Sequence, residues 1–219
     1  MVHYRYVALT VGILGLGCTD TAQEPSDRPG PSFLEAKPVV LIGAGDIAGC
    51  TSEYRDEATA RLLDTIPGTV FTLGDNVYPD GTAAEFKNCY GPSWGRHLAR
   101  SRPAIGNHEY HTTKGSGYLG YFGARAAPAG LPYYSYNLGA WHIVVLDSER
   151  YTWPQATWLK EDLAANPRRC TLAYWHRPYF TTGEIPAEVK LRNLFTILYK
   201  AGADVVISGH NHIYERFRP

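Results

Sequence analysis

The sequence lacks an excess of charge of either sign and lacks a long apolar segment after its N-terminus. The 219 residues include 21 Lys+Arg and 21 Asp+Glu, so nothing in the composition indicates binding to nucleic acid or to an anionic membrane surface. From residue 19 onward no segment has the roughly 18 apolar residues that a membrane span needs. With 44% hydrophobic residues, the chain can bury the core of one sizeable domain.

Cysteine is also scarce, and the first of the four cysteines ends an apolar N-terminal run. Residues 1–17 carry Arg5 followed by an apolar stretch too short to span a bilayer, which predicts a signal peptide. Small residues before Cys18 resemble a bacterial lipoprotein signal, so we expect an exported protein that is anchored by a lipid on Cys18 or is otherwise secreted. Residues 18–36 are polar and proline-rich, which predicts a disordered tether.

The other three cysteines do not have the spacing of a zinc motif. Cys50 and Cys89 each lie in a predicted loop just after a candidate site strand, so a disulfide between them is plausible in an oxidising compartment. Cys170 opens an apolar run, which favours a small buried side chain.

From Pro38 onward, apolar runs typical of strands alternate with segments of helical spacing. We expect strands over 38–46, 69–75, 102–108, 170–176 and 203–210, and helices over 53–66, 154–166 and 186–202. Residues 133–139 and 141–148 form two further runs with a tight connection, which predicts paired strands. This alternation indicates an α/β fold with parallel strands.

Five of these strands end in residues that can bind a metal ion. They are Asp46, Asp75, Asn107 with His108, His176, and His210 with His212. Taken singly, the aspartates are equally typical of turns, and a lone histidine is more often structural; the GHNH motif, residues 209–212, is the strongest signal. In α/β sheets ligands bind beyond the carboxyl ends of the strands, so we expect these side chains to converge.

The combined set contains carboxylate, amide and imidazole donors, which suit iron, zinc or manganese better than magnesium or calcium alone. A carboxylate such as Asp75 can bridge two ions about 4 Å apart, a spacing that suits phosphoryl transfer. The sequence therefore predicts a two-metal site.

The ordered blocks GDIAG, GDNVY, GNHE, YWH and GHNH are similar to those of the calcineurin-like metallophosphoesterases, and within them the chain resembles the purple acid phosphatases. The resemblance runs from about Val39 to the last residue. It implies a two-sheet αββα sandwich with a binuclear centre at the strand ends, and residues 37–219 as the catalytic domain. That fold normally continues into further strands, so we expect either that the domain is truncated at its C-terminus or that the fold closes in an unusual way.

The resemblance also implies a role for each residue. Asp46, Asp75, Tyr78 and His212 would hold the first metal, Fe(III) in that family, and Asp75, Asn107, His176 and His210 a divalent Zn, Fe or Mn. His108 would be the general acid, and Asn107 and His108 would contact the substrate. Tyr78 could instead be a buried structural tyrosine. The histidines that help bind phosphate in plant members have no match, and Arg177 and Tyr179 are the candidates to replace them.

The implied reaction is hydrolysis of a phosphate monoester by a metal-bound hydroxide, with His108 protonating the leaving group. A phosphodiesterase or nucleotide hydrolase with the same metal core is the alternative, and a non-catalytic lipoprotein that binds a phosphorylated ligand ranks third. The expected partner is a small phosphorylated substrate, with no nucleic acid and with membrane contact only through Cys18. We expect His142 to be packed in a strand and His97 and His111 to lie in loops or at the surface. The glycine- and aromatic-rich segment 110–130 either lines the site or packs.

Overall fold

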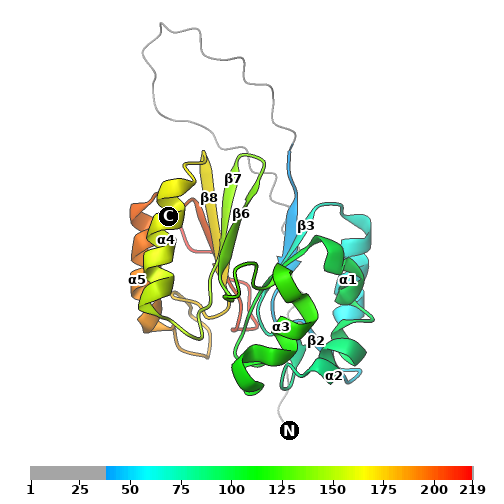
Figure 1. Cartoon of the computed structure of the whole chain (residues 1–219). Coiled ribbons are helices and arrows are strands. Elements are labelled where there is room, and N and C mark those ends of the chain that lie inside the picture. The colour runs from blue at the N-terminus through cyan, green and yellow to red at the C-terminus, as the bar shows by residue number, and fades with distance from the viewer. Residues whose placement is uncertain (1–37, 219) are drawn as a thin grey trace, which may run out of the picture.

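The computed structural model describes residues 38–218, which form two main β-sheets with helices on their outer sides (Figure 1). One sheet has the order β1-β3-β5 and is parallel throughout: β1 is Leu41–Ala44, β3 Thr69–Leu73 and β5 Ser101–Ala104. The other has the order β6-β7-β8-β9: Tyr134–Leu138, Trp141–Val145, Cys170–Trp175 and Val205–Ser208. Only β6, paired with β7 through a tight turn, is antiparallel in this sheet.

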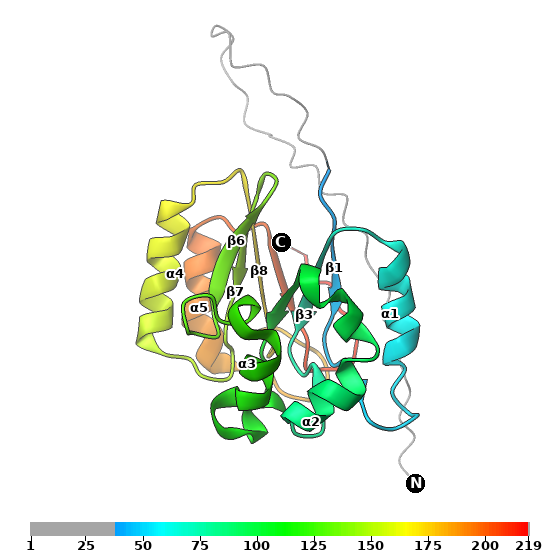
Figure 2. The ribbon, with the colours of Figure 1, turned by 45° about the vertical axis from the view of Figure 1, so that its right-hand side comes forward.

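Five α-helices accompany the sheets in the described residues. They are α1 (Asp56–Thr65), α2 (Ala83–Glu85), α3 (Ser116–Phe122), α4 (Trp153–Ala165) and α5 (Arg192–Lys200). Further helical segments, of 3₁₀ or π type, span Phe86–Tyr90, Trp94–Arg100, Glu109–His111, Thr113–Gly115, Gly123–Arg125 and Val189–Leu191. Two-residue strands β2 (Ala48–Gly49) and β4 (Val77–Tyr78) pair in parallel. Figure 2 shows α4 and α5 beside the second sheet and α1 beside the first.

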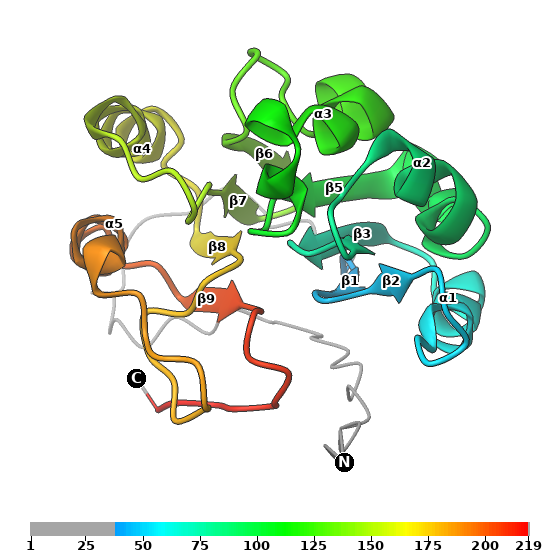
Figure 3. The same cartoon turned by 90° about the horizontal axis from the view of Figure 1, so that it is seen from below.

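Alternating side chains of the strands divide the interior into three apolar layers. In β3, Val70 packs into a core with α1 while the next residue, Phe71, faces the second sheet. In β7, Ile143 meets the first sheet while Val144 packs toward α4 and α5. Because successive residues of a strand point to opposite faces, both sheets are covered on both sides. The result is the predicted αββα sandwich, seen end-on in Figure 3.

The predicted strands and the helices near 53–66 and 154–166 are confirmed to within a few residues. The helix predicted over 186–202 was wrong at its start, since α5 begins at Arg192. The preceding loop is held instead by the C-terminal segment, where the amide of Ile185 donates to the Asn211 side chain at 3.0 Å. In the segment 110–130, the aromatic side chains of Tyr118 and Phe122 of α3 are buried in the core, whereas many of the other residues are exposed. That strands are missing from the C-terminus stays a prediction.

The predicted disulfide is confirmed: Cys50 and Cys89 are bonded, with 5.0 Å between their Cα atoms. Cys170 is buried, as expected. The predicted signal peptide, Cys18 and the tether lie outside the described residues. Within residues 38–218, the helices are too short or too polar to cross a membrane.

Candidate metal centre

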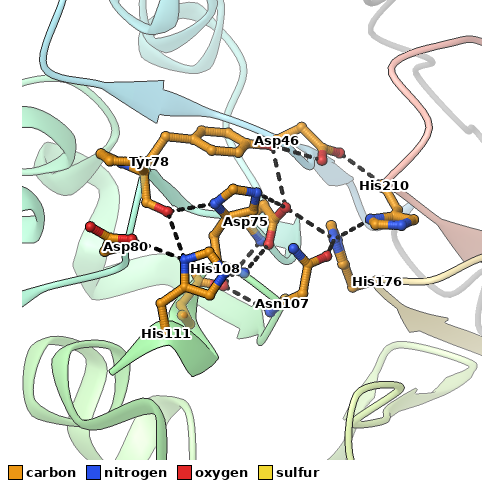
Figure 4. A network of polar contacts seen from close by, with 12 residues as sticks. Asp46, Asp75, Tyr78, Asp80, Asn107, His108, His111, His176 and His210 are labelled. Carbon is orange, nitrogen blue, oxygen red and sulfur yellow. Dashed lines mark hydrogen bonds and ion pairs between the residues drawn. The ribbon is translucent and has the colours of Figure 1, made fainter. Parts of the chain in front are cut away.

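The predicted site residues follow the carboxyl ends of parallel strands, and the structure brings them together. Asp46 follows β1, Asp75 follows β3, and Asn107 follows β5. From the second sheet, His176 directly follows β8 and His210 follows β9. Figure 4 shows these side chains pointing toward one another from the two sheets.

The backbone adopts an uncommon conformation at three of these residues. The φ angles are 56° at Asp46, 47° at Asp75 and 73° at His210. A left-handed conformation is uncommon for residues other than glycine and costs roughly 1–3 kcal/mol where the surrounding structure imposes it. Such residues cluster at functional sites, and here they aim three side chains inward from the strand ends.

Asp46, Asp75, Tyr78 and His212 form what we call the first donor group. The Tyr78 hydroxyl lies 3.0 Å from Asp46 Oδ1, 3.4 Å from Asp75 Oδ2 and 3.3 Å from His212 Nε2. His212 Nε2 is in turn 3.3 Å from Asp46 Oδ1. Asp75 and Tyr78 are buried, whereas the His212 side chain is 66% exposed, so this group is open to solvent on one side.

Asp75, Asn107, His176 and His210 form the second donor group. His176 Nε2 lies 3.2 Å from Asp75 Oδ2, 3.1 Å from Asn107 Oδ1 and 3.1 Å from His210 Nδ1. Asp75, His176 and His210 are all buried and offer donor atoms within 4.8 Å of one another. Asp75 Oδ2 contacts members of both groups, the position expected of a bridging carboxylate.

The residues present fit two metal ions. In the second group, Asp75, His176 and His210 offer donor atoms within 4.8 Å of one another, and in the first group the other three donors lie 3.0–3.4 Å from the Tyr78 hydroxyl. The mixture of carboxylate, phenol and imidazole suits iron, zinc or manganese. Burying several polar donor atoms this close together costs free energy, and a bound cation would compensate that cost.

Burial and mutual charge shift the pKa values within the site. Burial alone would raise the pKa of Asp75, but the charge and hydrogen bond of His176 outweigh it and lower that pKa to about 2. For His176, burial lowers the pKa, yet Asp75 dominates and raises it to about 9. Burial, followed by the charges of Asp46 and Asp75, raises the pKa of the Tyr78 phenol far above its usual range. A phenolate at Tyr78 therefore requires a cation that outweighs both carboxylates.

His108 stands at the edge of the site with one ring nitrogen fixed. Its Nδ1 lies 2.5 Å from the carbonyl oxygen of Pro79, so Nδ1 carries a proton and donates it. The other nitrogen, Nε2, is 3.7 Å from Asp75 Oδ2, so it is the ring nitrogen that faces the site. The ring packs edge-on against Tyr78, with centroids 4.5 Å apart.

Glu109 is the residue of this region to which the sequence analysis gave no role. It is fully buried, and its carboxylate accepts hydrogen bonds from the backbone amides of Asp75, Asn76, Val77 and Gly106 at 3.1, 2.7, 3.3 and 2.8 Å. Burial and the charge of Asp75 raise its pKa to about 7, against the effect of these donors. The signal was its place in the GNHE motif, directly after two candidate residues.

The remaining histidines have different surroundings. His142 is fully buried in β7 and contacts Asp162 at 2.7 Å, so the packing prediction is confirmed. The prediction of a loop or surface position for His97 was wrong, since it lies in the 3₁₀ helix Trp94–Arg100 with a side chain only 10% exposed, 3.0 Å from Asp64. His111 is at the surface as expected, but beside the site, with its ring 4.9 Å from that of His108 (Figure 4).

Of the two candidates for phosphate contact, Arg177 contacts a residue of the site, whereas Tyr179 packs against other aromatic rings. Arg177 Nη1 lies 2.9 Å from His210 Nε2. The Tyr179 ring packs against Phe180 and Phe195, with centroids 4.6 and 5.0 Å away.

Residues 33–214 match the family model described as calcineurin-like phosphoesterase. The chain belongs to this family. It is 27% identical to purple acid phosphatase 15 of Arabidopsis thaliana, a match that covers 90% of this chain and 43% of that protein. With probable purple acid phosphatase 20 of the same plant the identity is 30%, over 95% of this chain and 52% of the relative. The chain thus spans about half the length of these curated relatives.

Two solved structures share the fold. GAP50, described as the anchor in the inner membrane complex of Plasmodium, matches with a TM-score of 0.61 at 14% identity, over 78% of this chain and 65% of that one. A purple acid phosphatase from yellow lupin seeds matches with a TM-score of 0.51 at 19% identity, over 78% of this chain and 37% of that one. At sequence identities of 14% and 19%, these two matches show that the fold is shared and nothing about function.

Proposed function

We propose that the chain hydrolyses phosphate monoesters at a two-metal centre built from the two donor groups. The observation that carries the proposal is the position of Asp75, whose Oδ2 contacts members of both groups at 3.2 and 3.4 Å. Family membership and the similarity to purple acid phosphatases support the reaction class.

The first donor group would hold Fe(III), because its phenol and two carboxylates are the anionic oxygens that a hard trivalent ion favours. The second donor group, with two imidazoles and an amide oxygen, suits divalent zinc, iron or manganese. When bound, such ions neutralise phosphoryl oxygens and activate water for attack on phosphorus. Asn107 and His108, two adjacent residues in the loop that follows β5, would contact the substrate.

His108 is the group placed to protonate the leaving oxygen. Because Nδ1 is held by the Pro79 carbonyl, Nε2, on the side of the ring that faces Asp75, is the atom that would deliver the proton. A histidine positioned in this way contributes typically 10²–10⁴-fold as a general acid. A chain that only bound phosphorylated ligands would not need this arrangement.

The test uses the full chain, loaded with iron and zinc and assayed on p-nitrophenyl phosphate and on bis-p-nitrophenyl phosphate. We expect two metal ions per chain and a higher kcat/KM on the monoester, and we expect Asp75→Asn to lose both metal and turnover. Faster turnover of the diester would favour the phosphodiesterase instead. Full metal content without turnover of either compound would contradict an enzymatic function.

We also propose that the protein is exported, and that it is anchored through Cys18 or else secreted. The Cys50–Cys89 disulfide supports export, since disulfides persist mainly in oxidising compartments. Mass spectrometry of the mature protein from a Gram-negative host tests this proposal. A lipid on Cys18 would show the anchor, and an intact Met1 would contradict export by this route.

A further inference from the structure

A cationic side chain stands directly beside the second donor group. Arg177 follows His176 in sequence, and its Nη1 lies 2.9 Å from Nε2 of His210. The Arg177 side chain is only 25% exposed. Its guanidinium therefore lies at the edge of the site and does not extend into solvent.

The position of this guanidinium is fixed from outside the two donor groups. Arg177 Nε is 2.7 Å from Oε2 of Glu149, whose side chain is 9% exposed, and the Arg177 amide donates to Ser148 Oγ at 2.9 Å. Ser148 and Glu149 belong to the loop between β7 and α4. An arginine held through Nε keeps its planar fork oriented, so little further ordering is needed when it binds an anion.

The guanidinium retains donors that the protein does not use. It has five N–H groups, of which Nε is occupied by Glu149 and Nη1 contacts His210. Within residues 38–218, Nη2 has no hydrogen-bond partner. Arginine is well suited to phosphate because two of its N–H groups can contact phosphate oxygens together.

The two classes of phosphate ester differ in what they offer to such a cation. A monoester has three terminal oxygens and up to two negative charges, whereas a diester has two terminal oxygens and one charge. If two metal ions each take one terminal oxygen, a monoester keeps one oxygen for a further cation, and in a diester that position carries the second alcohol.

We propose that Arg177, positioned by Glu149, binds the terminal phosphate oxygen that monoesters have and diesters lack, and so sets the preference for monoesters. The inference rests on the proposed function of the same site. It adds a specificity-determining residue on the side of His210, whereas His108 lies on the side of Tyr78 and Pro79.

The test measures binding as well as turnover, on the metal-loaded full chain. Calorimetry compares inorganic phosphate with dimethyl phosphate for the wild type, Arg177→Gln and Arg177→Lys. We expect Arg177→Gln to weaken phosphate binding by roughly 10- to 100-fold, as for loss of a charged hydrogen bond, and dimethyl phosphate binding by less than about threefold. The phosphate affinity of Arg177→Lys should fall between those of the wild type and Arg177→Gln, because lysine keeps the charge and loses the planar fork.

Two further variants separate specificity from general damage. Glu149→Gln should weaken phosphate binding less than Arg177→Gln, since it loosens the anchor and leaves the cation. Arg150→Gln is the matched control, because Arg150 is on the same loop but lies over the Tyr110 ring at 4.3 Å, and it should leave both affinities unchanged.

Equal weakening of both anions by Arg177→Gln, or loss of metal from that variant, would overturn the inference and make Arg177 a support for His210. Such a result would leave the proposed function intact if the wild type still hydrolyses the monoester. A metal-loaded wild type that neither binds phosphate nor hydrolyses esters would overturn both.

Discussion

Removal of the Cys50–Cys89 disulfide is predicted to destabilise the domain and to weaken the first donor group. The two cysteines are 39 residues apart in sequence. In the chain-entropy description, a crosslink across a loop of that size lowers the conformational entropy of the unfolded chain, which stabilises the folded state by about 4 kcal/mol at 25 °C. The double variant Cys50→Ser/Cys89→Ser should lose most of this stabilisation.

The same crosslink supports the backbone beside Tyr78. Cys50 directly follows β2, in which Gly49 is paired with Tyr78 of β4, and the nearby Tyr54 ring stacks on Tyr78 with 5.5 Å between centroids. Loosening Cys50 therefore loosens the strand pair that carries Tyr78. We expect weaker metal binding in addition to lower stability.

Thermal unfolding followed by circular dichroism tests the magnitude. For a domain of this size, 1 kcal/mol corresponds to roughly 2–4 °C in Tm, so the double serine variant should melt about 8–16 °C below the wild type. Substitution is preferred to a reductant, because a reductant acts on every cysteine. A Tm within about 2 °C of the wild type would refute the reasoning, and a matching loss of iron from the variant would support the link to Tyr78.

Three further predictions concern the site. His108→Ala should keep both metals and lose roughly 10²–10⁴-fold in turnover; equal losses on good and poor leaving groups, measured by steady-state kinetics, would contradict its role as acid. Tyr78→Phe should remove the visible charge-transfer band of iron-loaded, oxidised protein while metal stays bound, and a band that persists would make Tyr78 a packing residue. Glu109→Ala leaves four buried N–H groups without their acceptor. Chemical denaturation should show that the free energy of unfolding falls by about 3–5 kcal/mol, and metal analysis should show weaker metal binding. Glu85→Ala, which removes a partly exposed capping residue, should cost about 1 kcal/mol, and equal losses in the two variants would contradict a special role for Glu109.

The strands and the donor residues could be predicted because their signals are local. Five of the seven donors lie one to three residues beyond a strand of the two main sheets, and the carboxyl ends of parallel strands meet at one edge. The pattern therefore placed Asp75 and His176 in the same site, although they are 101 positions apart, and the structure puts their side chains 3.2 Å from each other.

The features that the sequence did not reveal depend on distant contacts. Glu109 follows His108 in a polar loop, and only its hydrogen bonds to amides 32–34 residues away show that it is buried. The start of α5 was misplaced for a similar reason. Pro186 is a good first residue for a helix, but contacts from Asn211 to Ile185 and from Glu215 to Thr182 hold that segment as a loop.

The donor residues also hold one another's loops, which local motifs do not show. Asp46 Oδ2 accepts a hydrogen bond from the amide of His210 at 3.0 Å, and Asp75 Oδ1 accepts one from the amide of His108 at 2.9 Å. His176 Nδ1 lies 2.7 Å from the carbonyl oxygen of Leu73, so this nitrogen donates and Nε2 is left for a metal. Each aspartate thus has one oxygen facing the proposed metal site and a second oxygen that fixes a neighbouring loop. Asp46 holds the loop of His210, which has a positive φ angle, and Asp75 holds the loop of His108. Substituting either aspartate would remove a proposed ligand and a backbone contact together, so the effects of substitutions across the site should not be additive.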